Sequence, residues 1–196
     1  MRINKLLLTT AIVSSAFFSV TANAQVSTKN FIGPSVEIGL VHENTKVCES
    51  GLCEKDEDYG AKLSAQYGFQ TAVPNIVIGI GASYIPTTAN FFDGFFKIKN
   101  AMAAYVEPTY VLSDSTAVFG KLSYNRADLN SDFGIYGSYK NKISTIGFGA
   151  GVTHFVKSDV FLKAEIESVN YGTETVGPTD IKIQQTNATV SVGMKF

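Results

Sequence analysis

Apolar and polar residues alternate with a period of two along most of the sequence. The alternation is sustained in eight segments, most of them about ten residues or longer: 33–42, 58–70, 75–85, 97–111, 116–124, 140–154, 160–171 and 186–196. Strands of globular proteins average nearer five or six residues, whereas a tilted membrane strand needs about nine to eleven. Helical spacing is not sustained after residue 25. The pattern therefore predicts an all-β protein with eight long strands.

The connections between these strands alternate in length. They are short after the second, fourth and sixth strands, at 71–74, 113–115 and 156–159, and longer after the other strands. Transmembrane barrels have this arrangement, with tight periplasmic turns and longer outer loops. The sequence thus predicts an antiparallel up-and-down barrel that closes when segment 186–196 pairs with the first strand.

The two faces of the predicted strands differ in chemistry. One face is bulky and apolar, and the other is small or charged. An eight-stranded barrel is only wide enough inside for side chains to fill, so small and charged residues fit the interior. The inverted barrel would expose the charges to lipid, at about 2 to 4 kcal/mol for each Lys near the midplane. The predicted interior charges are Glu37, Lys62, Glu107, Lys121, Lys163, Glu165 and Glu167.

These interior charges have two interpretations. The favoured one is a ladder of salt bridges that fills the barrel, because buried charges need partners. The other is a polar lumen that passes ions or water. Three Lys balance four Glu only in part, and the sequence does not define the strand offsets that would pair them.

The N-terminus has the features of a secretory signal. Arg2 and Lys5 precede an apolar stretch at 6–20, and Ala22-Asn23-Ala24 forms an A-x-A cleavage site. We expect residues 1–24 to be removed and residues 25–196 to form one barrel domain. The alternative is an uncleaved membrane anchor, which the short apolar run disfavours.

Composition narrows the class of protein further. Charged residues make up 17% of the chain, against about 25% in soluble proteins. Loss of Arg2 and Lys5 reduces the 16 basic residues to 14 against 17 acidic ones, a net charge of −3. That balance argues against nucleic acid as a partner.

Cys48 and Cys53 are the two cysteines of the chain. In an oxidising compartment a nearby pair predicts a disulfide that closes a small loop. The alternative is a metal site built from both thiolates and nearby acids, but no second Cys pair or His cluster completes a ligand set. The surrounding segment, 43–58, is predicted to be a long, acidic, solvated loop, with Ca²⁺ or a basic partner as the less favoured ligands.

Four phenylalanines surround an Asp-Gly turn in the loop predicted after the third strand: Phe91, Phe92, Phe95 and Phe96. The favoured interpretation places them in the aromatic girdle at the outer membrane interface. The alternative is an exposed hydrophobic tip that contacts a host surface or another protein.

Catalysis would require His, Ser and an acidic residue to converge near the outer leaflet. His42 is predicted near the outer end without a suitable serine neighbour, and His154 lies near a short turn at the other end. We therefore assign no catalytic residue, no metal site and no cofactor.

The signal, the eight amphipathic strands, the segment GFGAGVTHFVKSDVFLKAEI and the terminal Phe196 together resemble the small bacterial outer-membrane β-barrel superfamily. This group includes the OmpA barrel domain, OmpX and the opacity proteins. The resemblance implies a monomer in the outer membrane whose partners are lipid, the assembly machinery and host or surface ligands of its loops. It also implies that the assembly machinery reads the last strand through Val190, Val192, Met194 and Phe196.

The function expected from this resemblance is non-enzymatic, with a structural role in the envelope and surface interactions through the outer loops. A narrow channel or small-solute uptake protein is the alternative. An enzyme that modifies outer-leaflet lipid is the third hypothesis.

Overall fold

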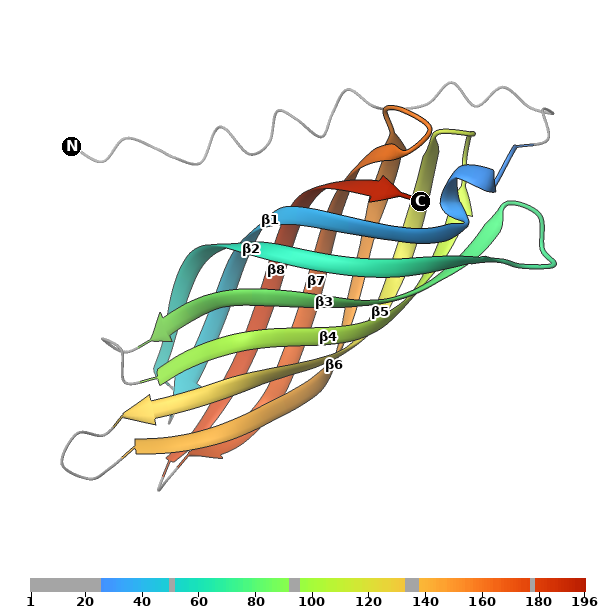
Figure 1. Ribbon diagram of the computed structural model, residues 1–196. Helices are drawn as coiled ribbons and strands as arrows, with labels where there is room; N and C mark the ends of the chain where they lie inside the picture. Colours follow the sequence, from blue (N-terminus) through green and yellow to red (C-terminus); the bar gives the residue numbers. More distant parts are fainter. Residues whose placement is uncertain (1–25, 50–51, 92–95, 133–137, 177–178) are drawn as a thin grey trace.

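The structure is a computed structural model that describes residues 26–49, 52–91, 96–132, 138–176 and 179–196. Eight antiparallel strands form one closed barrel in chain order (Figure 1). The strands are β1 (Gly33–Glu49), β2 (Leu52–Gln70), β3 (Ile76–Phe91), β4 (Phe96–Val111), β5 (Thr116–Asp132), β6 (Ser138–Phe155), β7 (Val160–Val176) and β8 (Thr179–Lys195). The predicted eight-stranded antiparallel barrel is therefore confirmed. None of the described residues forms a helix long and apolar enough to cross a bilayer.

Strand β8 closes the barrel on β1, as predicted. Their antiparallel ladder runs from Ser35 opposite Lys195 to Glu49 opposite Ile181. A short 3-10 helix, η2 (Lys29–Phe31), lies at the same end of the barrel as the C-terminus (Figure 1). We call this the inner end and the opposite end the outer end. The three short turns after β2, β4 and β6 are also at the inner end.

Exposed apolar side chains form a band around the inner part of the barrel. On β8 the even positions Val190, Val192 and Met194 point outward, between 46% and 66% exposed, while the odd positions are buried in the lumen. Tyr59 and Tyr124 mark the outer edge of this band. The predicted assignment of faces holds for this part of every strand.

Toward the outer end the alternation reverses its phase. On β8, Ile181 and Ile183 occupy odd positions and are fully buried, whereas apolar residues of the band on the same strand face outward. The same reversal on other strands, together with a bulge in β4 that turns Ile98 inward, produces an apolar interior cluster: Val47, Ile98, Ala127, Leu129, Ile143, Val169, Tyr171, Ile181 and Ile183. Apolar side chains point inward here because the exterior of this part contacts water rather than lipid.

We call this part the outer head, and it corrects two predictions. The head comprises the strand residues 42–49, 52–58, 85–91, 96–101, 125–132, 138–145, 168–176 and 179–187. Six of the predicted strands stopped at least five residues short at this end, whereas 97–111 and 140–154 agree with β4 and β6 to within two residues. The predicted long loop at 43–58 belongs largely to β1 and β2. The strands leave only residues 50–51, 92–95, 133–137 and 177–178 between them at this end. The strands were predicted from a continuous apolar face. That face stops where the alternation changes phase, so the predicted strands stopped there as well.

The barrel wall separates into two sheets within the outer head. The ladder between β2 and β3 stops at Leu63 opposite Tyr84, and the ladder between β6 and β7 stops at Gly147 opposite Val169. The remaining ladders continue almost to the tips. Strands β7–β8–β1–β2 therefore face strands β3–β4–β5–β6 across the apolar cluster, in the manner of a β-sandwich.

The edge of β2 that the separation leaves unpaired carries its own hydrogen-bond acceptors. Asp56 Oδ1 accepts from the backbone N–H of Glu57 at 3.0 Å, and Asp58 Oδ1 accepts from that of Tyr59 at 2.8 Å. Backbone groups on an open edge are otherwise available to pair with another chain. The two aspartates therefore reduce the tendency of this edge to associate.

The other edges are protected in different ways. Thr145 Oγ1 of β6 donates to the backbone oxygen of Asn170 on β7 at 2.7 Å, and Asn141 Nδ2 donates to that of Thr175 at 3.2 Å. Side chains thus bridge the separation between β6 and β7. On β3, Pro86 lacks an N–H group and lies beside a register shift.

A bulge in β4 corrects the predicted direction of one side chain. Ile98 was predicted to face lipid, but it is only 5% exposed and joins the interior cluster of the head. The register shifts between Lys99 and Met102, and Asn100 adopts a positive φ of 52°. The extra residue changes the phase of the alternation, which explains why Asn100 occurs on an otherwise apolar face.

Candidate functional site

The lumen at the level of the apolar band holds a buried network of charges. Lys121 Nζ donates to Glu165 Oε1 and Glu167 Oε2, both at 2.9 Å, and Lys62 Nζ donates to Glu165 Oε1 at 2.6 Å. Ser123 Oγ donates a further hydrogen bond to Glu167. Two Lys and two Glu therefore neutralise one another across β2, β5 and β7.

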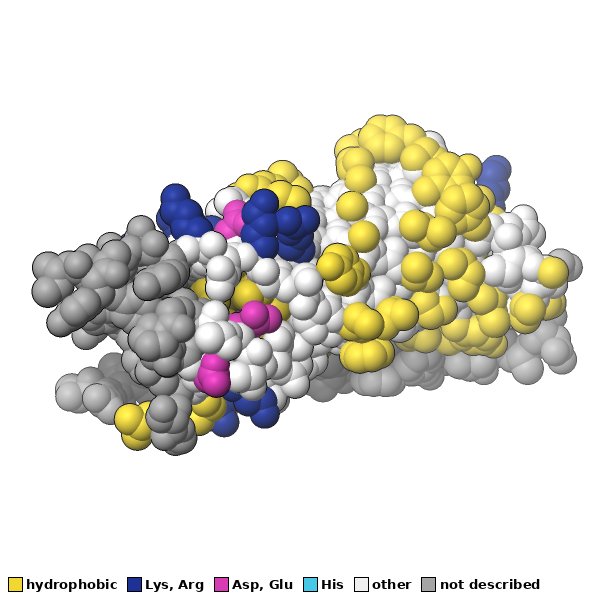
Figure 2. Space-filling view, turned by 90° about the horizontal axis from the view of Figure 1, so that it is seen from below, with side chains coloured by type: hydrophobic (Ala, Val, Ile, Leu, Met, Phe, Trp, Pro, Cys, Tyr) yellow, Lys and Arg dark blue, Asp and Glu magenta, His cyan; other side chains and the backbone are white. Residues whose placement is uncertain are grey.

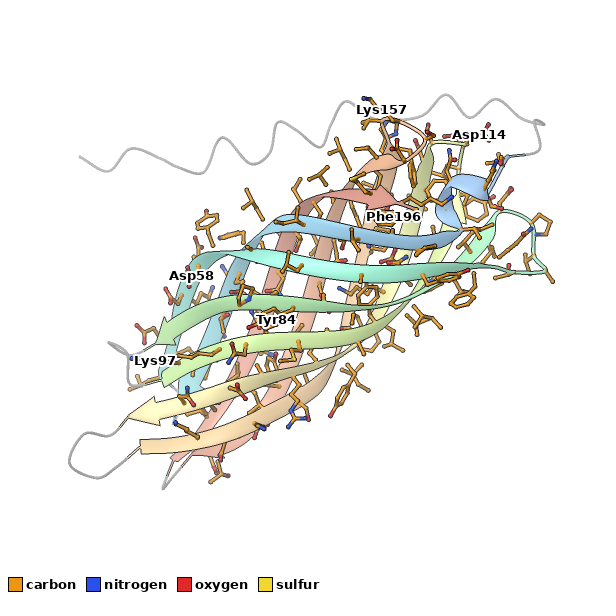
Figure 3. All side chains as sticks on the ribbon, viewed as in Figure 1. Asp58, Tyr84, Lys97, Asp114, Lys157 and Phe196 are labelled. Atoms are coloured by element: carbon orange, nitrogen blue, oxygen red, sulfur yellow. A yellow bond between two sulfur atoms is a disulfide. The ribbon has the colours of Figure 1, made fainter. Side chains whose placement is uncertain are left out.

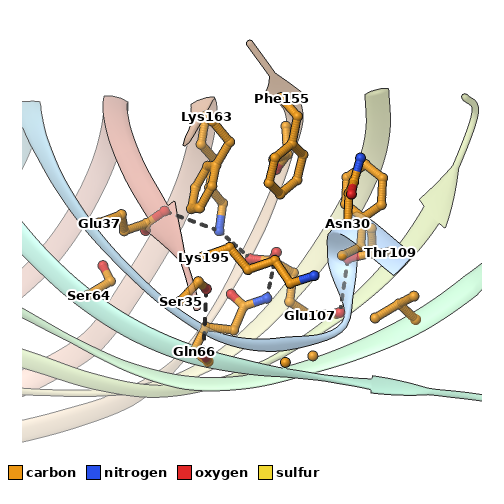
Figure 4. A pocket seen from close by; sticks show the side chains of 16 residues that line it. Asn30, Ser35, Glu37, Ser64, Gln66, Glu107, Thr109, Phe155, Lys163 and Lys195 are labelled. Atoms are coloured by element: carbon orange, nitrogen blue, oxygen red, sulfur yellow. Dashed lines mark hydrogen bonds and ion pairs between the residues drawn. The ribbon is translucent and has the colours of Figure 1, made fainter. Parts of the chain in front are cut away.

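A second cluster lies toward the inner end (Figure 4). Lys163 Nζ donates to Glu107 Oε2 at 2.7 Å and lies 3.8 Å from Glu37 Oε2. Gln66 Nε2 donates to Glu107 Oε1 at 3.4 Å. The ring of Tyr105 connects the two clusters, because its centroid is 4.7 Å from Lys121 Nζ and 5.9 Å from Lys163 Nζ.

All seven predicted interior charges are buried in the lumen, and their side chains are at most 8% exposed. The sequence analysis missed one buried charge of the lumen, Glu43. Glu43 is 4% exposed and accepts from Gln185 Nε2 at 2.8 Å. It has the same inward parity as Glu37, but it lies beyond the predicted end of the first strand.

An aromatic cap covers the inner mouth of the lumen. Phe31 of η2 packs edge-on against Phe155 with ring centroids 5.1 Å apart, and Phe155 packs on Phe161 at 5.3 Å. Asp114 holds the N-terminal segment in place, because its side chain accepts from the Ser27 backbone N–H at 2.8 Å. The alternation of apolar and polar residues could not predict these contacts, because they depend on a turn-rich segment that folds back over the mouth.

Little free space remains between these layers. A cavity of about 40 Å³ lies among residues of the second cluster and the cap, including Ser64 and Thr109 (Figure 4). A cavity of about 10 Å³ lies beside Lys62 and Asn187. One water needs about 10 to 15 Å³ measured in this way, so these cavities hold a few waters at most.

Cys48 and Cys53 form a disulfide, as predicted. They are directly opposite each other on β1 and β2, with Cα atoms 4.0 Å apart. The bond therefore joins the two strands next to the tip of their hairpin. Among the described residues, no group of three or more His, Cys, Asp or Glu is arranged to hold a metal ion.

The predicted aromatic residues occur at the far tip of the β3–β4 hairpin. Phe91 and Phe96 pair through the backbone, and Phe92 and Phe95 lie outside the described residues. Phe91 follows Tyr84, near the outer edge of the apolar band, by seven residues, or about 15 Å along the barrel axis for tilted strands. The side chains of these four residues are outside the described part of the structure, so the girdle and the exposed-tip interpretations both stay predictions.

The two histidines, His42 and His154, lie toward opposite ends of the barrel. His42 stacks on Tyr59 with ring centroids 4.7 Å apart, and its Nε2 lies 3.7 Å from Glu57 Oε2. His154 Nδ1 lies 2.9 Å from Thr116 Oγ1 near the inner end. Neither contact brings a serine, a histidine and a carboxylate together.

The outer head carries cations on both of its sheets, and five of them lie on three neighbouring strands of one sheet. Figure 2 shows apolar side chains over the inner part of the barrel, and most of the visible Lys and Arg side chains, together with Asp and Glu side chains, nearer the outer end. The outward positions of β4, β5 and β6 supply a group that we call the basic face: Lys97, Lys99, Arg126, Lys140 and Lys142. Figure 3 shows Lys97 near the outer end, well separated from Asp114 and Phe196 at the inner end.

These features define a class of protein, the closed transmembrane barrel with an apolar exterior band and a filled polar lumen. The family described as outer membrane protein beta-barrel domain matches residues 10–196, and the chain belongs to this family. No curated protein matches the sequence.

Several solved structures are similar in fold. Neisserial surface protein A (NspA) is 17% identical, with a TM-score of 0.58 over 84% of this chain and 97% of that chain. Ail, the attachment invasion locus protein of Yersinia pestis, was solved with the heparin analogue sucrose octasulfate; it is 12% identical, with a TM-score of 0.55 over 84% of this chain and 100% of that chain. OprG from Pseudomonas aeruginosa is 11% identical, with a TM-score of 0.52 over 89% and 99%.

The protein is therefore a small β-barrel of the bacterial outer membrane. The inner end, with its three tight turns, corresponds to the periplasmic side and the outer head to the cell surface. Val190, Val192, Met194 and Phe196 lie in the apolar band or at its inner margin, and all four are exposed. Their role as an assembly signal stays a prediction, as does cleavage of residues 1–24, which lie outside the described residues.

Proposed function

We propose that the protein is a non-enzymatic surface-interaction protein whose outer head presents binding surfaces above the membrane, with a structural role in the envelope. The observation that carries this proposal is the apolar core of the head. Val47, Ile181 and Ile183 are at most 1% exposed, and together with their neighbours they hold two sheets face to face. A head built in this way positions its outward side chains on rigid strands, which suits specific recognition.

The cross-strand disulfide supports the same function. The Cys48–Cys53 bond joins β1 and β2 beside their tip at the outer end of the barrel. A covalent link at that place limits fraying of the hairpin and preserves the shape of its surface.

The names of two similar proteins agree with a surface role. Ail is called an attachment invasion locus protein and was solved with a heparin analogue, and NspA is called a surface protein. At 12% and 17% identity these likenesses show the fold alone, so they support the class of function rather than a ligand.

The lumen network supports a barrel that does not conduct. Lys121 and Lys163 engage glutamates from strands two or three places away around the barrel, and the aromatic cap covers the mouth below them. An ion would have to displace these buried pairs, which is strongly unfavourable in a low-dielectric interior. We therefore place the structural role of the lumen above the alternative of a narrow channel.

Adhesion of whole cells tests the surface role. Bacteria without other surface-binding proteins would display the full chain, or a variant whose β3–β4 hairpin is shortened by replacing residues 88–98 with a two-residue turn. Binding to cultured host-cell monolayers should fall to background with the shortened head. A lumen variant, Ser123→Ala, serves as the matched control and should bind normally. Equal adhesion by the shortened variant, at equal surface level, would contradict the proposal.

A further inference from the structure

The charges buried in the lumen do not balance. Five glutamates and three lysines are buried there: Glu37, Glu43, Glu107, Glu165, Glu167, Lys62, Lys121 and Lys163. The network that Lys62 and Lys121 form with two of these glutamates is neutral. The excess negative charge therefore lies toward the two ends of the lumen. A buried charge needs either a partner of opposite sign or a metal ion.

At the inner end, one negative charge is left without a close cation. Lys163 Nζ donates to Glu107 Oε2 at 2.7 Å but lies 3.8 Å from Glu37 Oε2, which is beyond hydrogen-bond distance. No other cation lies within 4 Å of either carboxylate among the described residues. Lys195 lines the same cavity, but its Nζ donates to the backbone oxygen of Lys29 at the mouth, where water screens its charge. The charge of Glu37 is therefore the least compensated of this cluster.

The cavity beside Glu37 is lined by side chains that carry oxygen atoms. Glu37 is directly opposite Ser64 on β2, and Ser35 is directly opposite Gln66. All four residues line the cavity of about 40 Å³ (Figure 4). This volume accommodates about three particles of the size of a water molecule. The cavity can thus hold a small ion together with one or two waters.

Ser64 gives an independent indication that something binds in this cavity. The residue is only 6% exposed, and its Oγ has no hydrogen-bond partner among the described residues. A buried hydroxyl without a partner is destabilising, so such a group calls for a bound water or ion. In Figure 4 the Lys163 ammonium lies beyond the end of the Glu37 side chain, and Ser64 lies beside that side chain. A cation next to Ser64 would therefore not displace Lys163.

We propose that the lumen binds one monovalent metal cation between the Glu37 carboxylate and Ser64 Oγ. Ser35 Oγ and waters would supply further oxygen ligands, which hard cations prefer. One positive charge neutralises the inner cluster, whereas a divalent ion would leave an excess positive charge near Lys163. Charge therefore favours a monovalent ion. This inference goes beyond the proposed function, because it concerns the lumen rather than the surface of the head.

The test measures urea unfolding of the full chain in phosphatidylcholine vesicles at neutral pH, with Na⁺ as the probe. Stability would be compared at about 5 mM and about 500 mM Na⁺, with choline chloride keeping the ionic strength constant, because choline is too large for the cavity. Each sample is refolded in its own buffer, so that the cap closes over the ion present. An ion that binds only the folded state lowers the unfolding equilibrium constant. With a dissociation constant below about 50 mM, this constant should fall at least about tenfold.

Three variants locate the ion. Glu37→Gln removes the excess charge, so its unfolding constant should change less than about twofold between the two Na⁺ concentrations. Glu43→Gln is the matched control, because it also removes one buried lumen glutamate but does not line the cavity, and it should keep the full Na⁺ dependence. Ser64→Ala keeps the charge but removes a ligand, so it should need at least about fivefold more Na⁺ for the same stabilisation.

Several results would overturn the proposal. A stability that does not depend on Na⁺ would show that a proton or water alone occupies the site. An equal Na⁺ dependence in Glu37→Gln, or its loss in Glu43→Gln, would contradict the location, and a larger effect of Ca²⁺ than of Na⁺ at equal concentration would contradict a monovalent ion. Unboiled gel mobility confirms that every variant is folded. Cell adhesion, which tests the proposed function, is measured separately.

Discussion

Replacement of Lys121 by Met gives the sharpest energetic test of the lumen network. Lys121 Nζ lies 2.9 Å from oxygens of both Glu165 and Glu167, and its side chain is 1% exposed. Methionine has similar length but no charge. Glu165 would retain Lys62 at 2.6 Å, whereas Glu167 would have no cation within 4 Å among the described residues.

The expected cost follows from this loss of a partner. Removing one member of a buried ion pair destabilises a protein by about 3 to 5 kcal/mol, because the remaining charge stays buried. The double change Lys121→Met/Glu167→Gln removes both charges. The Gln side chain can still accept the hydrogen bond from Ser123, so at least half of the lost stability should return.

The assay is urea unfolding in lipid vesicles, followed by the mobility of unboiled samples on gels and by tyrosine fluorescence, since the chain has 9 Tyr and no Trp. Lys182→Met, on the outward surface of the head, is the control and should change stability by less than about 0.5 kcal/mol. If Lys121→Met costs no more than this control, or if the double variant is less stable than the single one, the network does not stabilise the barrel.

Three other changes test separate parts of the fold. Gly193→Val should cost about 1 to 3 kcal/mol, because its Cβ would collide with the buried ring of Phe161; an unchanged urea midpoint would contradict this packing. Asp56→Ala with Asp58→Ala should increase self-association in detergent, measured by sedimentation, because the β2 edge loses its local acceptors; an unchanged monomer fraction would refute the edge argument. Deletion of Phe196 should impair outer-membrane insertion more than any change in the head, and normal surface yield would remove its assembly role.

The sequence was sufficient for the barrel because lipid imposes one simple rule on every strand. On β1 the even positions Val36, Ile38 and Leu40 are exposed in the apolar band, whereas the odd position Glu37 faces the lumen. Closure by β8 followed, since lipid-exposed strand edges cannot satisfy their backbone groups. The same reasoning assigned seven charges to the interior, where their side chains are at most 8% exposed, although their pairing required strand offsets that only the ladders define.

The outer head was missed because the rule changes where the barrel leaves the membrane. Val41 and Val47 on β1 are buried at odd positions, immediately after a run of exposed apolar residues at even positions. Each half of such a strand is amphipathic, but the joined segment has no single apolar face. A change of phase at the same height on several strands is the signal that would have revealed the head, and Leu122 followed by Leu129 on β5 shows it again.

The aromatic cap and the basic face were inaccessible to the sequence for another reason. Phe31 contacts Phe155 although 124 positions separate them, and no periodicity relates a turn-rich segment to the end of a distant strand. The basic face likewise combines two cations from β4, one from β5 and two from β6. Its members become neighbours only through the register of β4, β5 and β6.

Planar-bilayer recording tests the central claim most directly, which is that a rigid outer head stands on a filled and non-conducting barrel. The refolded full chain should give no reproducible conductance steps above the baseline of the protein-free membrane. Reproducible steps from the unmodified chain that are abolished by Lys121→Glu would show that ions pass through the charged lumen, and would contradict the account.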